Sequence, residues 1–394
     1  MKIFVLLSRV PYPTEKGDKL RAFHQIRCLA ARHEVILCAL SDIKVHPDAL
    51  KVLGEFCSQV HIIPISKPGM VWNVMKAVFN GNPFQVGYFY RCKASKKINH
   101  LIEETKPDHI LCQLIRMAEY VKNQRIPKTL DYQDVFSMGI KRRAATSPAC
   151  QKPFWMIEYR RILRYEQAVF DYFDHKTIIS QPDCDLIPHP RRNEIVIVPN
   201  GVDHGYFYPV EKTKTFDVVF TGNMGYPPNV DAARFIAEEI FPLVLKQLPE
   251  MKLLISGANP HPRVQALQSQ NITVSGWVPD IRESYAKSRI FIAPMRIGTG
   301  LQNKLLEAMA MGLPCITSLL ANQALGAKEN EEILIGQDAS EYASHIIRLL
   351  QDKALAGTLA QKGHEFVKRV FSWENSARLL ENLFLKSLSN QIPE

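Results

Sequence analysis

The sequence contains no apolar run that approaches the roughly 20 residues needed to cross a bilayer as a helix. The apolar stretch near the N-terminus, residues 3–7, is too short for the apolar region of a secretory signal and instead predicts a β-strand. From these absences we predict that the protein neither spans a membrane nor is exported. We therefore expect the 394-residue chain to work in the cytoplasm.

Signatures of metal and disulfide chemistry are also missing. The eight cysteines are scattered without a C-x-x-C pair, and the twelve histidines form no H-E-x-x-H or other ligand-spaced cluster. In a reducing cytoplasm the cysteines are expected to be buried thiols, and a structural zinc site is not predicted. Asp183 and Asp185 form an Asp-x-Asp triplet, but the helix dipole favours acids near a helix start and so short a pattern recurs by chance. We therefore predict neither a metal nor a cofactor.

Two further classes of protein are disfavoured by motifs that the chain lacks. No G-x-G-x-x-G follows the first expected strand, residues 2–7, so a nicotinamide-dependent dehydrogenase is a poor match. The 49 Lys and Arg residues exceed the 39 Asp and Glu residues, giving a net charge of +10 that favours an anionic partner. Because no nucleic-acid recognition motif is present, we expect no nucleic acid and attribute the excess to phosphates and a membrane surface.

The distribution of apolar segments indicates an α/β protein. At about 150 residues per domain, the length predicts two to three domains. Short apolar runs alternate with amphipathic stretches over residues 2–198, and the alternation restarts at residues 216–220 after a polar connector. This alternation is typical of βαβ units and parallel sheets. We predict two tandem Rossmann-like, doubly wound domains facing a cleft, residues 1–207 and 208–371, followed by a C-terminal segment, residues 372–394.

Residues 294–314 hold the largest group of candidate functional residues, and their pattern predicts a strand end, a glycine-rich loop and a helix. Gly298 and Gly300 near the helix start leave backbone N–H groups free to face an anion. Arg296 lies at the carboxyl end of the strand, and Lys304 and Glu307 share one helix face. Two cations suit a diphosphate, and a carboxylate one turn further on suits sugar hydroxyls. The alternative is an ordinary loop followed by a solvent-exposed Lys–Glu pair.

This segment resembles the donor-binding motif of the family 4 retaining glycosyltransferases, which have the GT-B fold of two Rossmann-like domains. The resemblance covers nearly the whole chain, is strongest over residues 177–374, and fits the sugar transferases of bacterial exopolysaccharide and surface-polysaccharide clusters. The order and spacing of the family's elements are more specific than any one of them. The further elements are Val198–Asp203 with Phe207 and Pro209, Phe220–Met224, Gly276–Asp280, and Phe371–Trp373 before a last helix.

The resemblance implies a retaining, metal-independent transfer of a sugar from a nucleotide-diphosphate sugar to an acceptor hydroxyl. The second domain is expected to bind the donor, the first to bind a saccharide or lipid-linked saccharide acceptor, and the C-terminal helix to pack back on the first domain. The residues expected to act in catalysis are Asp134, Arg296, Lys304 and Glu307. Those expected to bind the donor are Gly17, Gly222, Asn223, Val278, Gly298, Thr299, Gly300 and Leu301.

The second domain departs from the family pattern in two places. Thr299 stands where the family often has a glutamate, so the carboxylate that would hold the transferred sugar is missing. Asn223 and Asn229 lie in the stretch where the family usually has an arginine and a lysine. The diphosphate charge is therefore expected to rest on Arg296 and Lys304, since arginine can bind phosphate through two hydrogen bonds.

The first domain offers two weaker matches. Residues 12–21 resemble the family's glycine loop but contain only Gly17, and the alternative is a plain helix start with Asp18 as the capping residue. At the end of a later expected strand, Gln133 occupies the position of the family's histidine and Asp134 matches the following acid. A carboxylate there can hold a sugar hydroxyl. The alternative is that Asp134 caps the next helix.

Two other functions for the same fold stay open from the sequence. A nucleotide-sugar 2-epimerase needs acid–base groups around the sugar, and the histidines lie mostly outside the motif loops. A non-catalytic nucleotide-sugar-binding protein is compatible with the departures at Thr299 and Gln133.

A possible membrane-docking segment completes the expectations. If residues 67–84 form a helix, Trp72, Met75 and Phe79 lie on one face of it. Such an apolar face suits docking on an anionic membrane leaflet. The alternative is a helix packed into the core. Because the chain carries basic clusters nearby, we expect peripheral binding at the inner face of the cytoplasmic membrane. These clusters are Arg91, Lys93, Lys96 and Lys97, and Lys141–Arg143.

Overall fold

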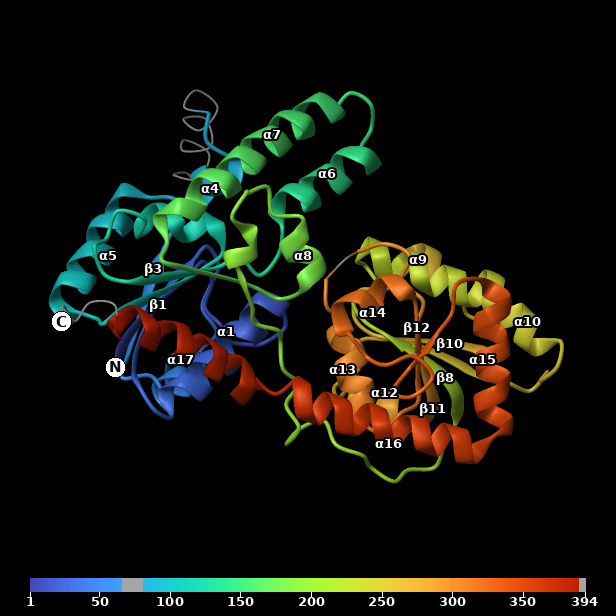
Figure 1. Cartoon of the computed structure of the whole chain (residues 1–394). Helices are drawn as coiled ribbons and strands as arrows, with labels where there is room; N and C mark the ends of the chain where they lie inside the picture. Colours follow the sequence, from blue (N-terminus) through green and yellow to red (C-terminus); the bar gives the residue numbers. More distant parts are fainter. Residues whose placement is uncertain (66–80, 299, 390–394) are drawn as a thin grey trace. The chain divides into compact units, whose positions relative to one another are not determined.

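The chain folds into two compact α/β units (Figure 1). The structure is a computed structural model that describes residues 1–65, 81–298 and 300–389. The first unit consists of Met1–Pro199 together with Trp373–Glu394, and the second consists of Asn200–Ser372. The predicted docking residues Trp72, Met75 and Phe79 lie outside the described residues.

The two units divide earlier in the chain than the predicted boundary at residue 208. The backbone N–H of Val202 donates to the carbonyl of Phe371 at 3.0 Å, and Val202 also forms an isolated β-bridge with Ser372. Phe207 packs against the hydrophobic core of the second unit. The connector after residue 199 therefore belongs to the second unit, because its backbone and its apolar side chain are both bound there.

The first unit is built on a seven-stranded parallel sheet of order β3-β2-β1-β4-β5-β6-β7. Its central strands are short, continuous apolar runs, as expected for strands that helices cover on both faces. The strands are β1 (Lys2–Leu7), β2 (Glu34–Ser41), β3 (Gln59–Pro64), β4 (His109–Gln113), β5 (Lys128–Asp131), β6 (His175–Ile178) and β7 (Val196–Ile197).

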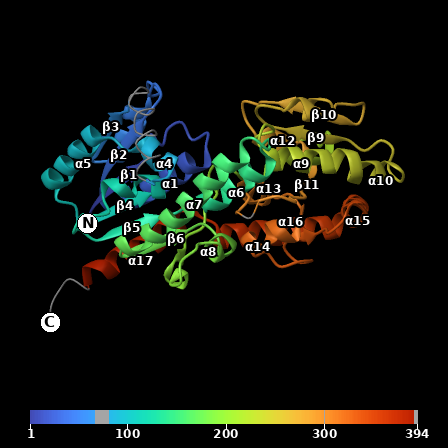
Figure 2. The same cartoon turned by 90° about the horizontal axis from the view of Figure 1, so that it is seen from above.

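Helices cover both faces of this sheet, so alternate residues of β1 enter two separate cores. Ile3 and Val5 join one core with α17 (Trp373–Ser389), whereas Phe4 and Leu6 join the other. Figures 1 and 2 show α17 beside the strands of the first unit, which confirms the predicted return of the C-terminal helix. The other helices are α1 (Gly17–Ala30), α2 (Ala49–Gly54), α4 (Phe84–Phe89), α5 (Cys92–Thr105), η1 (Ile115–Tyr120), α6 (Phe136–Thr146), α7 (Lys152–Val169), η2 (Phe170–Tyr172), α8 (Gln181–Asp185) and η3 (Arg192–Glu194).

The second unit repeats this architecture with a six-stranded parallel sheet of order β10-β9-β8-β11-β12-β13. The carboxyl ends of β8, β10 and β11 carry the loops to which the sequence analysis assigned the donor site. The strands are β8 (Phe216–Thr221), β9 (Leu253–Ser256), β10 (Ile272–Gly276), β11 (Ser288–Ala293), β12 (Cys315–Thr317) and β13 (Leu334–Ile335). The helices are α9 (Pro227–Phe235), η4 (Ile236–Ile240), α10 (Phe241–Leu245), α11 (Pro262–Gln265), α12 (Arg282–Ala286), α13 (Asn303–Ala310), α14 (Leu319–Leu325), α15 (Ala339–Gln351) and α16 (Lys353–Val370).

Candidate functional site

The candidate site lies at the carboxyl edge of the second sheet, where parallel α/β sheets bind their ligands. Two glycines allow the loops after β8 and β9 to touch. A Cβ atom on Gly257 would lie 1.7 Å from the carbonyl oxygen of Gly222, and Gly257 has a φ of +143°. Only glycine tolerates both constraints. Gly222, a predicted donor-binding residue, is thus fixed in place by a neighbour that the sequence analysis did not single out.

Lys304 extends from α13 to the end of β8. Its ammonium donates to Oδ1 of Asn229, lies 4.8 Å from the centre of the Phe220 ring and is 3.8 Å from Sδ of Met295. Asn229 in turn donates from its amide to the carbonyl of Asn223 at 2.9 Å. Burial lowers the pKa of Lys304 to about 7, and the charge of Glu307 only partly opposes this shift. The groups that Lys304 contacts directly, Asn229, Met295 and Phe220, are neutral, so its charge is available to an anion.

Glu307 lies one turn further along α13 and has a different partner. The hydroxyl of Tyr285 donates to its Oε2 at 2.7 Å, and the same hydroxyl lies 2.8 Å from Oγ1 of Thr221. Burial raises the pKa of Glu307 to about 7, while the hydrogen bond from Tyr285 and the charge of Lys304 act in the opposite direction. Near neutral pH this carboxyl group can therefore either accept or donate a hydrogen bond.

Arg296 does not join Lys304. Its guanidinium forms two hydrogen bonds with Asp231, at 2.8 and 3.0 Å, contacts Glu239 at 3.4 Å and lies 4.3 Å from the centre of the Phe235 ring. Asp231 is two residues beyond Asn229 on α9, so the two point about 200° apart around the helix. The expectation that Arg296 and Lys304 form one diphosphate clamp is therefore not met in this structure, because two carboxylates already bind the arginine.

The glycine-rich loop runs from the end of β11 to Asn303. Gly298 has a φ of +102°, a conformation that favours glycine, while Gly300 and Leu301 follow as partly exposed residues. Thr299 lies outside the described residues. Val278 is partly buried in the loop after β10, next to Trp277, which is 70% exposed. Val278, Gly298, Gly300 and Leu301 follow the carboxyl ends of β10 and β11, at the same edge of the sheet as Gly222.

The two predicted residues of the first unit, Gly17 and Asp134, lie in the segments that follow β1 and β5. Gly17 is the first residue of α1, and Asp18 accepts from Arg9 at 3.0 Å rather than capping the helix. Asp134 is exposed after β5 and accepts from the N–H of Val135 at 2.7 Å. The first turn of α6 is bound instead by Glu166, whose Oε1 accepts from the N–H of Ser137. Asp134 therefore does not cap α6, and the buried Glu166 of α7 binds the start of that helix instead.

The Asp-x-Asp triplet is used locally. The hydroxyl of Ser180 donates to Oδ2 of Asp183 at 2.5 Å, and Gln181 donates to Asp185 at 2.8 Å. Within the described residues, no group of three or more His, Cys, Asp or Glu side chains could hold a metal ion. Nor does this part of the chain contain a helix with the length and apolar character needed to span a membrane.

Sequence reasoning missed the partners that hold the site together. Asn229 was noted only as a departure, although its side chain contacts both Lys304 and Asn223. Tyr285 carries no signal of its own, because it lies 22 residues from the Glu307 that it binds. A glycine directly after a buried strand is the signal that could have identified Gly257.

Two parallel-sheet α/β units, each with its loops at the carboxyl edge, define the GT-B fold, and the fold prediction is confirmed. Residues 215–352 match the family model described as Glycosyl transferases group 1. The matched residues lie within the second unit. Over 397 residues the chain is 22% identical to an uncharacterized 44.6 kDa protein in the cps region of Klebsiella pneumoniae, covering 94% of this chain and 98% of that one.

Solved structures give the same fold at low identity. Sucrose-phosphate synthase from Thermosynechococcus elongatus superposes with a TM-score of 0.71 at 17% identity, covering 99% of this chain and 100% of that one. HepE from Anabaena, solved in complex with UDP, gives a TM-score of 0.68 at 14% identity, with the same two coverages.

Proposed function

We propose that the protein is a retaining glycosyltransferase that moves a sugar from a nucleoside diphosphate donor to an acceptor hydroxyl. The single observation that carries this proposal is the pair on α13: a partly buried ammonium at Lys304 and a carboxyl group at Glu307, one turn apart. A cation whose direct hydrogen-bond partner is a neutral amide suits a diphosphate, and a carboxyl group one turn away suits the hydroxyls of a ribose or sugar.

In this proposal the diphosphate is the leaving group, and its developing charge is stabilised by Lys304 and by loop amides around Gly222 and Gly298. Electrostatic stabilisation of this kind is commonly a large part of catalysis. Arg296 takes no part while Asp231 and Glu239 hold it. The departure at Asn229 fits the assignment, because a neutral amide orients Lys304 without neutralising it.

The acceptor oxygen attacks the anomeric carbon from the face that the diphosphate leaves. The bond from that carbon to the acceptor oxygen forms as the bond to the phosphate oxygen breaks, and the acceptor proton passes to the departing phosphate. This route needs no metal. The first unit is proposed to hold the acceptor, with Asp134 at the carboxyl end of β5 offering a carboxylate to a sugar hydroxyl.

A surface polysaccharide or glycolipid is the proposed product. The support is the relative from the cps region of Klebsiella pneumoniae, which matches along almost the full length of both chains. The acceptor is then a saccharide or a lipid-linked saccharide, and the reaction takes place where such lipids are reached from the cytoplasm.

The test is a panel of nucleotide sugars incubated with the purified protein, followed by mass spectrometry of the products. Donor hydrolysis or transfer to an added saccharide is expected for at least one donor. Isomerisation of the donor without an acceptor would instead identify a 2-epimerase, and tight binding without any turnover would identify a nucleotide-sugar-binding protein. Neither binding nor turnover across the whole panel would overturn the proposal.

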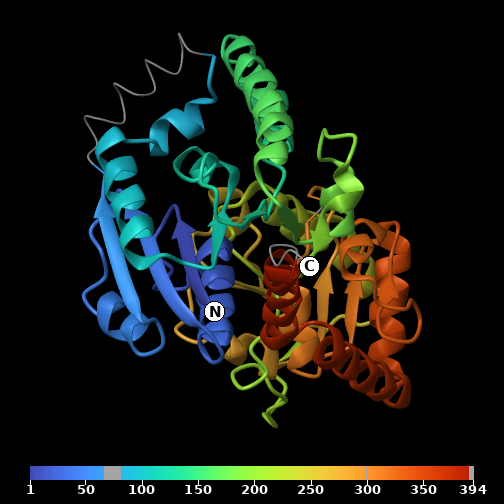
Figure 3. The same cartoon turned by 60° about the vertical axis from the view of Figure 1, so that its left-hand side comes forward.

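Peripheral membrane contact is proposed for the helical hairpin α6–α7 of the first unit. The hairpin projects from the strands of that unit (Figures 1 and 3). Phe154, Met156 and Ile157 near the start of α7 are 49%, 38% and 48% exposed. The two acids of the hairpin, Glu158 and Glu166, are buried and accept backbone N–H groups. The cations are Lys141, Arg142, Arg143, Lys152, Arg160, Arg161 and Arg164.

Exposed apolar side chains among cations suit an anionic leaflet. The apolar group enters the headgroup boundary, and each Lys or Arg near the surface adds about 1 kcal/mol. Such binding is reversible and weakens with salt, because exposed charges are screened.

A further inference from the structure

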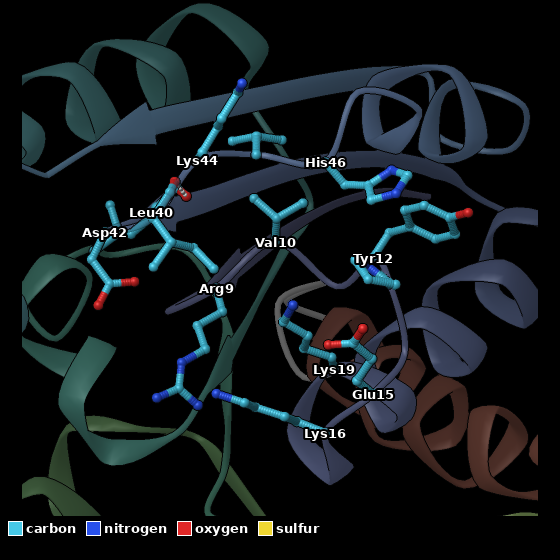
Figure 4. Close-up of a pocket in the computed structure, with 14 residues that line it drawn as sticks. Arg9, Val10, Tyr12, Glu15, Lys16, Lys19, Leu40, Asp42, Lys44 and His46 are labelled. Atoms are coloured by element: carbon cyan, nitrogen blue, oxygen red, sulfur yellow. Dashed lines mark hydrogen bonds between the residues drawn. The ribbon is translucent and has the colours of Figure 1, made fainter. Parts of the chain in front are cut away.

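The first unit contains a pocket that the proposed chemistry has not used. It has a volume of about 340 Å³ and lies at the carboxyl ends of β1 and β2, beside the start of α1 (Figure 4). A volume of this size suits a small ligand such as a sugar phosphate. Its charged lining residues are Arg9, Glu15, Lys16, Lys19, Asp42 and Lys44.

Lys19 is the residue that points to a ligand. It is only 8% exposed, and the described residues provide its ammonium with neither a hydrogen bond nor an ion pair within range. Figure 4 shows Lys19 reaching from α1 toward the strand end that carries Arg9 and Val10. The ammonium of Lys19 is open to the pocket that the residue lines, where it can donate hydrogen bonds to an entering anion.

Cations outnumber acids in the rest of the lining, where Arg9, Lys16 and Lys44 lie with Glu15 and Asp42. Lys16 and Lys44 are exposed at its rim. Asp42 already accepts a hydrogen bond from Tyr88 at 3.0 Å, and Arg9 is paired with Asp18.

Backbone groups add to this preference. Within the described residues no side chain caps α1, a helix of 14 residues, so the N–H groups of its first turn remain available beside Lys19. Free N–H groups and the helix dipole both favour negative charge at this end.

We propose that this pocket binds the phosphate group of a phosphorylated acceptor, with Lys19 as its central contact and Lys16 and Lys44 at its rim. The proposal rests on the proposed function in calling the ligand an acceptor, whereas the phosphate site itself rests on the pocket alone. The phosphate belongs either to a soluble sugar phosphate or to the diphosphate of a lipid-linked sugar, and both present the same group to Lys19.

The experiment is calorimetric titration of the full-length protein with α-glucose 1-phosphate and with glucose linked to a short prenyl chain through a diphosphate. Lys19→Met is expected to weaken binding of at least one probe about 10- to 100-fold, the loss typical of a charged hydrogen bond. Binding of UDP should not change. Stronger Lys19-dependent binding of the prenyl probe identifies a lipid-linked acceptor, and of glucose 1-phosphate a soluble one.

Matched variants keep the result interpretable. Lys51→Met removes an exposed lysine of α2 with the same charge change and should leave binding unchanged. Lys19→Arg should retain most of the affinity. Lys44→Ala alters only the exposed rim and should weaken binding several-fold even if Lys19→Met fails to fold.

Three outcomes decide the matter. Unchanged probe affinity in both Lys19→Met and Lys44→Ala overturns the proposal. A loss of UDP affinity in Lys19→Met with probe affinity intact also overturns it, because Lys19 then serves the donor. If the nucleotide-sugar panel shows no turnover but Lys19-dependent phosphate binding persists, the proposed function fails and the phosphate pocket stands.

Discussion

The hydroxyl of Tyr285 donates a hydrogen bond of 2.7 Å to Oε2 of Glu307. Tyr285 is fully buried, and the same hydroxyl lies 2.8 Å from Thr221 at the end of β8. The bond fixes one carboxylate oxygen of Glu307 and holds its pKa below the value that burial alone would give. Tyr285 therefore positions the carboxyl group that we propose to face the donor.

Removing this hydrogen bond should shift the pH dependence of activity. In Tyr285→Phe the pKa of Glu307 should rise above about 7, because the opposing hydrogen bond is lost. If the ionised carboxylate is the active form, kcat/KM falls at pH 7 and recovers at higher pH. The pH profile of kcat/KM checks this, since a merely structural defect would lower activity equally at every pH.

Replacing the carboxylate itself should affect catalysis more than folding. Glu307→Gln keeps the shape of the side chain and can still accept from Tyr285, so the melting temperature should change little. We expect kcat/KM to fall at least 10-fold, because the charge beside the donor hydroxyls is lost. Full activity in this variant would remove Glu307 from the site.

Lys304 should govern donor affinity. Lys304→Met is expected to weaken binding of UDP or a UDP-sugar by about 1.5–3 kcal/mol, the contribution of a charged hydrogen bond. Calorimetric titration measures the change. Lys246→Met, which removes an exposed lysine of the same unit, is the control and should bind as the unmodified protein does.

Donor binding should take up protons above neutral pH. Burial lowers the pKa of Lys304 to about 7, so at pH 8 most of the free protein carries a neutral amine. A diphosphate raises that pKa again, since an opposite charge favours the ammonium. We expect uptake approaching one proton at pH 8 and less at pH 6, measured by titration in two buffers of different ionisation enthalpy. Equal proton uptake at both pH values would contradict this account.

Gly257 should tolerate no side chain. In Gly257→Ala the new Cβ would meet the carbonyl of Gly222 at 1.7 Å, so the loop after β8 must move. We expect a loss of about 2–4 kcal/mol in the free energy of unfolding, together with weaker donor binding. Gly357→Ala, within α16 and with open space around it, should instead be neutral or stabilising. Denaturant titration compares the two.

The α6–α7 hairpin should bring the protein to anionic vesicles at low salt and release it at high salt. The double variant Phe154→Ser with Ile157→Ser should pellet less, because its exposed apolar surface is lost. Its melting temperature is measured alongside, because Phe154 also stacks on Phe84. Neutral vesicles provide the control. The same assay tests the separate prediction for Trp72 and Phe79. Failure of the intact protein to pellet at low salt would favour a soluble acceptor.

Much of the fold followed from the sequence because it depends on local patterns. The continuous apolar runs predicted the strands, and alternation with helices predicted two parallel sheets. The boundary was harder to place, since the pairing of Val202 with Ser372 joins residues far apart in the chain. Apolar spacing carries no information about such a contact.

The place of a candidate residue in the fold was predictable where it follows from the local motif. Gly222, Lys304 and Glu307 lie at the sheet edge where the pattern placed them. The direction of a long side chain is set by its neighbours in space, so the capture of Arg296 by Asp231 could not be read from the sequence. The same reason hid the bond between Tyr285 and Glu307.

Because α17 packs in the first unit, it also determines which of the two units can finish folding first during synthesis. Leu380 and Phe384 of this helix are part of the core that β1 and α1 share. The ribosome makes residues 200–372 before α17, so the middle of the chain can finish folding while the earlier residues still lack a piece of their interior. Multidomain chains usually fold from the N-terminus onward. Here we expect that order to be reversed, with a partly exposed apolar surface on the nascent first unit until its last helix emerges.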